Sequence, residues 1–507
     1  MMNRRIRWLG FVLLACFVLL FVQLNNFQVR QAQSLVNNPH NQTLLPDPYT
    51  LARGDIYSSE GLVLAWSKPT NDGYGELRIY PPATATLFAG ITGYESVAVG
   101  NATGLELEYN QFLTQHNTPS STLGQLLTQH KTTDDITLTV SVALQEVAAQ
   151  ALAGRAGAVV AIDPRTGAIL AMYGNPTFDP NVFAVHSGPK GESAYDAVIN
   201  SYNKLLASPG DPLINYATGR AEAPGSTFKV VDTSAIYDLA PHVANQVFPS
   251  VPYITLPETN GQTLSNFQDE YCGGPLAEIL ARSCDTAFAL VGEELGPEKL
   301  FKQATAFGFD AVPPIDLPEG EAAASNFPVP QDFAGDTPGL MKSAIGQENV
   351  TATALQMALV AAGIADNGVI MAPHLLDKII DDEGNLVESY HPHAWRRATS
   401  AATAQSVRQL MLGVTEDSYG TAAGLFPSYL FPPVAAKTGT AQINSTGCGT
   451  YNWLIATAPA GPGETPSVAV AAIVPVPPGS ACVDVTGALE AGPVVRAVMQ
   501  KALEMQQ

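Results

Sequence analysis

Three short motifs contain the residues of this sequence whose types and spacing could carry out chemistry. In the first, the segment S-T-F-K places the hydroxyl of Ser226 three positions before the amine of Lys229. Residues at this spacing share one face of a helix. A serine hydroxyl needs a base to become a nucleophile, and lysine can be that base when burial and nearby positive charge lower its pKa. The pair therefore indicates a serine nucleophile with a lysine base, although the same string also occurs in ordinary helices.

The second motif, Ser283-Cys284-Asp285, follows a helix predicted over residues 276–281. Serine and aspartate are preferred helix caps. This motif alone therefore does not separate a catalytic role from a capping role.

The third motif, Lys437-Thr438-Gly439-Thr440, lies in the strand predicted over residues 434–442. The lysine and the two threonines offer a charge and hydroxyls for a carboxylate, and the glycine permits close approach of a substrate to the strand. A strand end with a solvated lysine is the simpler interpretation. The order S-x-x-K, S-x-[N/D], K-T-G is nevertheless that of the serine–lysine enzymes that recognise penicillin, so the three motifs together are much stronger evidence than any one.

The elements that must hold these motifs are predicted by hydrophobic periodicity and turn signals. Strands at 158–163 and 168–173 flank the turn P-R-T-G, and Asn349 or Thr351 would cap a helix at 353–364. The chain ends with three predicted strands, at 434–442, 452–458 and 467–474, and one predicted helix, at 492–505. Strands at both ends of a domain with helices between them predict one sheet that is closed by the two ends.

A smaller α+β region is predicted before this domain, from residue 49 to residue 155. Segments 53–57 and 61–65 indicate two strands joined by a turn, residues 136–140 alternate as a strand, and residues 143–152 favour a helix.

An apolar stretch near the N-terminus predicts a membrane anchor. The uncharged segment 8–27 follows Arg4, Arg5 and Arg7 and is long enough to span ~30 Å of hydrocarbon. The positive-inside rule then places the N-terminus in the cytoplasm and the remainder outside. A cleaved signal peptide is the alternative, with a weak cleavage site near residues 32–34.

Composition limits the classes of function. The chain has 507 residues and a formal net charge of −21, which argues against a nucleic-acid-binding protein because phosphates require a basic face. Apolar residues make up 46% of the chain, enough for a substantial core.

The chain resembles the class B penicillin-binding proteins, the monofunctional peptidoglycan D,D-transpeptidases. Besides the three motifs, the resemblance rests on R-G-D-I with G-L-V-L-A (53–65), L-T-V with L-Q (138–145), the segment 157–181, and I-G-Q with L-Q-M-A (345–358). It extends over roughly the whole chain.

The resemblance implies a fold and a division into domains. Residues 1–28 would form a cytoplasmic tip and a transmembrane helix, and residues 29–155 a linker and a small α+β pedestal. Residues 156–507 would form a transpeptidase domain of the β-lactamase-like α/β (α+β) class, with a central antiparallel sheet and a helical insertion. The catalytic domain would lie outside the cell membrane.

The resemblance also implies a role for each residue of the motifs. Ser226 would be the acylated nucleophile, Lys229 its base, and Ser283 a proton shuttle toward the leaving amine. Lys437 would hold positive charge at the site, and Thr438, Gly439 and Thr440 would bind the substrate, the two threonines through its carboxylate. The backbone N–H groups of Ser226 and Thr440 would form the oxyanion hole.

The implied substrates are stem peptides that end in D-Ala-D-Ala, with an amine of a neighbouring stem as the acceptor, and β-lactams would acylate the same serine. No metal or cofactor is implied. The pedestal would contact a membrane-embedded glycan polymerase of the SEDS family.

Asp285 departs from the family, most of which carries asparagine at this position. An ionised carboxylate cannot donate a hydrogen bond to a substrate, and its charge favours the protonated forms of nearby lysines. Either Asp285 pairs with Lys437 and leaves Lys229 neutral, or acylation is slow at neutral pH.

Four cysteines beyond residue 270 allow two disulfides in an oxidising compartment. Cys272 and Cys284 flank the helix at 276–281. Cys448 and Cys482 follow two strands whose ends could meet. Free buried thiols are the alternative.

Three other functions share some of these features. A D,D-carboxypeptidase or a β-lactamase uses the same motifs, but a β-lactamase needs neither an anchor nor the region 49–155. A non-catalytic β-lactam-binding sensor or scaffold is the third, and a sensor would need a cytoplasmic output domain, whereas about seven residues precede the predicted span.

Overall fold

The computed structural model describes most of the chain, namely residues 52–72, 75–114, 116–117, 131–443, 449–477, 479 and 485–506, with positions 8, 14, 17, 19 and 23. The chain divides into two compact units, Met1–Leu51 with Thr70–Glu76 and Ala52–Pro69 with Leu77–Gln507. The helices and strands described below belong to the second unit, except that Glu76, the first residue of the strand Glu76–Ile79, belongs to the first. Among the described residues no helix is long and apolar enough to cross a bilayer, and the predicted span over 8–27 lies largely outside them.

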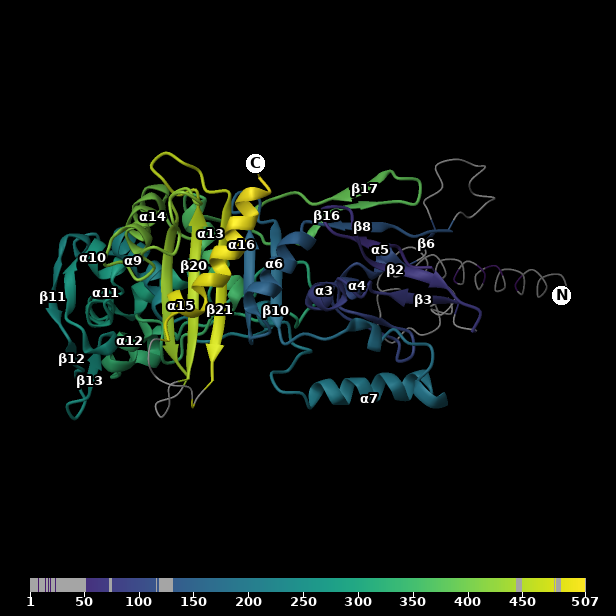
Figure 1. Ribbon diagram of the computed structural model, residues 1–507, viewed down its shortest axis with the longest axis horizontal. Helices are drawn as coiled ribbons and strands as arrows, with labels where there is room; N and C mark the ends of the chain where they lie inside the picture. The colour runs from purple at the N-terminus through teal and green to yellow at the C-terminus, as the bar shows by residue number, and fades with distance from the viewer. Residues whose placement is uncertain are drawn as a thin grey trace. The chain divides into compact units, whose positions relative to one another are not determined.

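The larger sheet has five strands and is antiparallel throughout (Figure 1). Its strands, in order across the sheet, are β10 (Ile169–Asn175), β9 (Gly157–Ile162), β21 (Val468–Val476), β20 (Thr450–Ala458) and β19 (Ala435–Gln442). The hairpin β9–β10 therefore pairs with the last strand of the chain, which confirms a sheet closed by the two ends of one domain. β19, which carries the third motif, is an edge strand.

Both faces of this sheet are buried. Alternate residues of β21 enter two different apolar clusters, Val468, Val470, Ala472 and Val474 in one and Ala469, Ala471 and Ile473 in the other. Helices α6 (Val142–Leu152) and α16 (Gly492–Glu504) cover the first face, and α13 (Ala354–Ala365) packs against the second. Burial on both faces explains why the strand is continuously apolar and does not alternate.

The predicted helical insertion lies between β10 and β19. Its main helices are α9 (Lys229–Leu239), α10 (Leu276–Ala281), α11 (Asp285–Ala306), α12 (Thr337–Ser343), α13 and α14 (Ala401–Glu416). The bounds of α10 are those predicted. The predicted caps of α13 are wrong, because Thr353, directly before the helix, accepts the hydrogen bond from the Gln356 N–H at 3.0 Å.

A second, six-stranded sheet combines the N-terminal region with a hairpin from the insertion. Its order is β17 (Leu386–Ser389), β16 (Leu376–Ile380), β8 (Asp135–Leu138), β1 (Ile56–Tyr57), β2 (Val63–Pro69) and β3 (Glu76–Ile79). β1 and β8 run parallel and β8 and β16 antiparallel. The pedestal sheet thus takes two strands from the part of the chain beyond residue 156, and the domain division at that residue stays a prediction.

The R-G-D-I segment has a structural role in this smaller region. Arg53 and Arg78 both pair with the buried Glu106, at 2.9 and 2.6 Å, and Tyr80 donates to the same carboxylate. A Cβ on Gly54 would lie 1.9 Å from the backbone oxygen of Asp134. Charge pairing therefore accounts for Arg53, and close backbone packing accounts for Gly54.

Apart from one helix of 13 residues, the remaining elements are short. The helices are α3 (Ala85–Thr92), α4 (Gly104–Glu108), α5 (Asn110–Leu113), α7 (Ala194–Leu206), α8 (Tyr216–Gly219) and α15 (Gly487–Glu490). Two-stranded ladders pair β4 (Glu95–Ser96) with β5 (Asn101–Ala102), β6 (His116–Asn117) with β7 (Lys131–Thr132), β11 (Val247–Val251) with β14 (Cys272–Pro275), β12 (Tyr253–Thr255) with β13 (Thr263–Ser265), and β15 (Val369–Met371) with β18 (Ala394–Arg397).

Candidate active site

The first motif forms a tight turn that leads into a buried helix. Ser226 lies in the 3-10 turn Gly225–Phe228, and α9 begins at Lys229. The turn is fixed by Gly225, whose φ is +53° and whose added Cβ would lie 2.7 Å from the Thr440 oxygen. The Gly225 N–H also donates to the Gly346 oxygen at 2.9 Å. Contacts to two distant segments therefore set the position of Ser226, the predicted nucleophile.

Lys229 contacts both Ser283 and Asp285 of the second motif. Its Nζ lies 2.6 Å from Asp285 Oδ1, 2.8 Å from the Ser283 backbone oxygen and 3.4 Å from Ser283 Oγ. The side chain is fully buried. Burial lowers the pKa of Lys229, and the charge of Asp285 acts in the opposite direction. The lysine is thus held nearer to its neutral, basic form than a solvated lysine would be.

Ser283 is positioned by the way α10 ends. Its N–H donates to the Leu280 oxygen, the Cys284 N–H donates to the Ile279 oxygen, and Ser283 has a φ of +62°. These features define a Schellman motif, in which the left-handed position usually holds glycine. The capping and catalytic interpretations of this serine are therefore compatible, since the helix end aims its hydroxyl at both lysines.

Lys437 is the second buried lysine that contacts Ser283. It is fully buried, and its Nζ donates to Ser283 Oγ at 2.8 Å and to the Thr438 oxygen at 2.9 Å. Burial and the positive charge of Lys229 hold the pKa of Lys437 well below its ordinary value. Ser283 is thus within hydrogen-bond distance of both lysines, and these three residues with Ser226 are the candidate proton-exchanging groups.

Asp285 begins α11 and accepts hydrogen bonds from two members of this set. Its Oδ1 lies 2.6 Å from Lys229 Nζ and 3.3 Å from Ser226 Oγ. The alternative in which Asp285 pairs with Lys437 is wrong, because Lys437 donates to Ser283. The carboxylate instead joins Ser226, the predicted nucleophile, to Lys229, the predicted base.

The K-T-G strand forms the edge of the groove, as its place in the sheet requires. Thr438, Gly439 and Thr440 all line the groove, and the Thr438 hydroxyl is 2.7 Å from that of Thr421. A Cβ on Gly439 would lie 2.6 Å from the Pro224 oxygen and 2.9 Å from Thr227 Cγ2. The glycine therefore lets the strand approach the turn Gly225–Phe228, called the nucleophile turn below because Ser226 is the predicted nucleophile. This close packing is a reason for the glycine in addition to substrate access.

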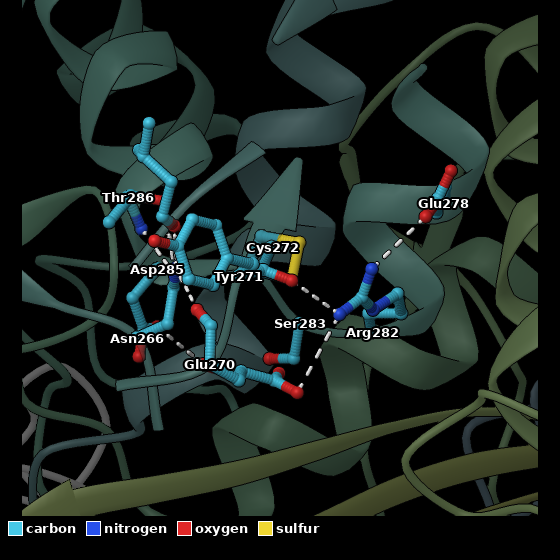
Figure 2. The surroundings of a disulfide bond; sticks show 12 residues. Asn266, Glu270, Tyr271, Cys272, Glu278, Arg282, Ser283, Asp285 and Thr286 are labelled. Atoms are coloured by element: carbon cyan, nitrogen blue, oxygen red, sulfur yellow. Dashed lines mark hydrogen bonds and ion pairs between the residues drawn. A yellow bond between two sulfur atoms is a disulfide. The ribbon is translucent and has the colours of Figure 1, made fainter. Parts of the chain in front are cut away.

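A disulfide joins Cys272 and Cys284, as predicted, with a Cα–Cα distance of 5.3 Å. The bond, drawn in yellow at Cys272 in Figure 2, connects the residue between Ser283 and Asp285 to the end of the loop that carries Asn266. The Asn266 side chain accepts from the N–H of Thr286 at 2.9 Å and donates to the Val251 and Glu270 oxygens. The second motif is thus clamped on both sides. Cys448 and Cys482 lie outside the described residues, so their pairing stays a prediction.

At least one residue of each motif opens onto one groove of about 1330 Å³, whereas Lys229 and Lys437 are buried beside it. Besides the predicted residues, its lining includes groups that the motifs did not indicate, among them Asn266, Lys342, Glu348 and Thr421. No local pattern marks these residues, since each comes from a separate loop or helix. Among the described residues no group of three or more histidine, cysteine or acidic side chains could hold a metal ion.

Asp232 is a further group that the motifs did not indicate. It lies one turn after Lys229 on α9, is fully buried, and has no hydrogen-bond partner for either side-chain oxygen within the described part of the chain. Burial raises its pKa well above the ordinary value. A neutral Asp232 would leave Asp285 as the carboxylate that sets the charge of Lys229.

Comparison with known proteins agrees with this geometry. Residues 157–500 match the penicillin binding protein transpeptidase domain, and residues 53–135 match the penicillin binding protein A dimerisation domain. The chain belongs to the penicillin-binding protein transpeptidases. Its relatives place it among the class B members of that family.

Two of these relatives match over nearly their whole length. The peptidoglycan D,D-transpeptidase PbpA of Mycolicibacterium smegmatis is 34% identical over 99% of both chains, and PbpA of Mycobacterium tuberculosis is 32% identical over 99% of both. The short N-terminal region and the Ser-Cys-Asp motif indicate a likeness to penicillin-binding protein A of actinobacteria, and this expectation is confirmed.

A solved structure extends the comparison to chemistry. The ceftriaxone acyl-enzyme complex of penicillin-binding protein A from M. tuberculosis has a TM-score of 0.78 and 30% identity, and it covers 90% of this chain and all of that one. That penicillin-binding protein thus forms a covalent complex with a β-lactam on the same fold.

Proposed function

We propose that this chain is a membrane-anchored peptidoglycan D,D-transpeptidase that forms an acyl-enzyme at Ser226 with stem peptides or with β-lactams. The observation that carries the proposal is the set of contacts that joins the three motifs. Ser283 contacts both buried lysines, and Asp285 contacts Lys229 and Ser226. The three motifs come from residues 226 to 440, and the fold brings them into one groove.

Acylation begins with a proton transfer from Ser226. Neutral Lys229 takes the hydroxyl proton, directly or through the Asp285 carboxylate, as Oγ attacks the carbonyl carbon of the D-Ala-D-Ala bond. The N–H groups of Ser226 and Thr440 stabilise the oxyanion. Ser283, which contacts both lysines, delivers a proton to the leaving D-alanine amine.

Thr438 and Thr440 hold the terminal carboxylate of the donor peptide at the strand edge. Lys437 adds positive potential beneath them and orients Ser283 through the 2.8 Å hydrogen bond. An edge strand suits this task because its free backbone groups can pair with an extended peptide. The acceptor amine of a second stem then attacks the acyl-enzyme and releases Ser226.

The cellular setting rests on the sequence. The apolar segment 8–27 after three arginines supports an anchor with a cytoplasmic N-terminus, so that the catalytic domain works outside the cell membrane. The disulfide in the site is compatible with an oxidising exterior. The pedestal sheet offers a surface for a SEDS-family glycan polymerase, the partner implied by the resemblance.

The test is labelling of the purified extracytoplasmic part with a fluorescent penicillin, followed by mass spectrometry of the labelled peptide. We expect one adduct, on Ser226, and no labelling of Ser226→Ala. Ser406→Ala removes an exposed hydroxyl on α14 and is the matched control, which should label normally. An adduct on another residue, or none after long incubation at several pH values, would contradict the proposal.

A further inference from the structure

Glu348 has a backbone conformation that its residue type does not favour. Its φ is +58°, and it occupies the first central position of a turn closed by the Val350 N–H and the Gln347 oxygen at 3.3 Å. Glycine, asparagine and aspartate are preferred where a turn requires positive φ. The turn alone does not account for a glutamate, and such outliers are concentrated at functional sites.

The segment that carries Glu348 packs directly against the nucleophile turn. A Cβ on Gly346 would lie 2.1 Å from the Gly225 oxygen, and the Gly225 N–H donates to the Gly346 oxygen. Gly225 also contacts Thr440 of β19. The nucleophile turn therefore contacts both the donor-binding strand and the segment of Glu348.

Glu348 forms an ion pair with Lys342 of α12 at 2.6 Å, and both side chains line the groove. Their side chains are 40% and 36% exposed, respectively. Ion pairs at this exposure contribute little to stability. A ligand with matching charges could therefore replace the pair at small cost.

We propose that Glu348 and Lys342 form the subsite for the acceptor, and that the acceptor is an amine whose carbon also bears a carboxylate. Glu348 binds the ammonium group and Lys342 the carboxylate, so both charges of the pair stay compensated when the ligand enters. This inference rests on the proposed transpeptidase function and names its second substrate. The donor needs neither residue, because its carboxylate is assigned to Thr438 and Thr440.

The transfer step balances with the groups present. The bound ammonium loses one proton to solvent, and the amine nitrogen then forms a bond to the acyl carbon. The bond between that carbon and Ser226 Oγ breaks, and Oγ takes the second nitrogen proton by way of Lys229. The products are an amide and the free serine.

The test measures how one acyl-enzyme divides between water and an amine. A thioester donor ending in D-alanine generates the acyl-enzyme, and the ratio of aminolysis to hydrolysis is measured with glycine and with glycinamide as acceptors. This ratio does not depend on how fast the acyl-enzyme forms. The variants are Glu348→Gln and Lys342→Gln, with Glu348→Asp as the variant that keeps the charge. Glu294→Gln is the control, because Glu294 lies outside the groove lining and accepts from Gln246 at 2.6 Å.

We expect Glu348→Gln to lower the ratio about tenfold with both acceptors, since a charge-assisted hydrogen bond is lost. Lys342→Gln should lower it about tenfold with glycine and leave it unchanged with glycinamide, which has no carboxylate. Glu348→Asp should retain more of the ratio than Glu348→Gln, and Glu294→Gln should match the parent protein.

An unchanged ratio in Glu348→Gln overturns the proposal. The proposal is also overturned if the ratio with glycine falls in Thr440→Val but not in Lys342→Gln. The acceptor carboxylate would then bind where the carboxylate of the leaving D-alanine binds. Absence of any acyl-enzyme from the thioester would instead refute the proposed function, and burst kinetics with the donor alone detects this separately.

Discussion

At the scale of single residues, one carboxylate determines how the two buried lysines divide their charge. Asp285 contacts Lys229 and Ser226, whereas Lys437 donates to two neutral oxygens. Burial favours the neutral form of both lysines, and Asp285 offsets this effect mainly at Lys229. The pH at which Lys229 becomes neutral therefore depends first on burial and then on Asp285, a side chain that does not itself attack the substrate.

Replacement of Asp285 by asparagine should move the acylation profile toward lower pH. Without the carboxylate charge the pKa of Lys229 falls further, and a base that must be deprotonated then becomes available at lower pH. Lowering the lysine pKa by about one raises the reactive fraction about tenfold while the pH stays well below the pKa. The measurement is the second-order rate of acylation by a β-lactam from about pH 5 to about pH 10, a range wide enough to contain a lysine pKa lowered by burial.

The matched control for this measurement is Asp377→Asn, which removes an exposed carboxylate on β16. Its profile should coincide with that of the parent protein. If Asp285→Asn only slowed acylation and left the profile in place, the carboxylate would act through its hydrogen bond to Ser226.

At the scale of elements, the end of α10 and the start of α11 form one rigid unit. The Schellman motif places Ser283, the disulfide fixes Cys284, and Asp285 opens α11 one residue later. Three consecutive residues thus receive their positions from three different constraints. Loss of one constraint should affect both stability and chemistry.

Replacement of Cys272 and Cys284 together by serine should lower the free energy of unfolding by about 3 kcal/mol, the value expected for a closed loop of about a dozen residues. Acylation should also slow, because Ser283 and Asp285 lose the cross-link to β14. Thermal unfolding and the β-lactam acylation rate measure the two effects. Non-reducing peptide mapping of the parent protein verifies the bridge, and equal stability of the two proteins would contradict the expectation.

Sequence patterns predicted the elements well and their long-range partners less well. The helix at 276–281, the hairpin β9–β10 and the strand 434–442 follow from local periodicity, and the motif order indicated that the three motifs meet. The partner of Asp285 could not be predicted, because the choice between two lysines depends on backbone positions more than 50 residues apart. Asn266 and Glu348 carry no local signal, since their roles arise only where separate loops meet.

At the scale of the whole molecule, the two sheets are not independent. β16 leaves the transpeptidase region and pairs with β8 of the pedestal, and Ile379 of β16 is fully buried beside Ile136. The parallel pairing of β1 with β8 continues this sheet. Local patterns could not reveal the arrangement, because the strand that completes the pedestal comes more than 200 residues later.

A chain that begins at residue 156 should therefore be less stable than one that begins at residue 52. Without β8, Leu376 and Ile379 lose their cover, and each such side chain contributes about 1.5–3 kcal/mol when buried. The longer chain should show coincident unfolding transitions by tryptophan fluorescence and by penicillin labelling. Two separated transitions, or an equally stable shorter chain, would show that the regions fold independently.

The glycine at position 225 has a consequence for how activity relates to chain completion. It is fixed by segments near residues 346 and 440, and Ser283 is fixed in part by Lys437. A ribosome-bound or truncated polypeptide that ends before β19 holds the nucleophile and its base but lacks the surfaces that shape them. Such a chain should not react with penicillin, so a fluorescent penicillin should label complete chains and leave incomplete chains unlabelled. The antibiotic thereby becomes a reagent that reports when the fold of this enzyme is complete.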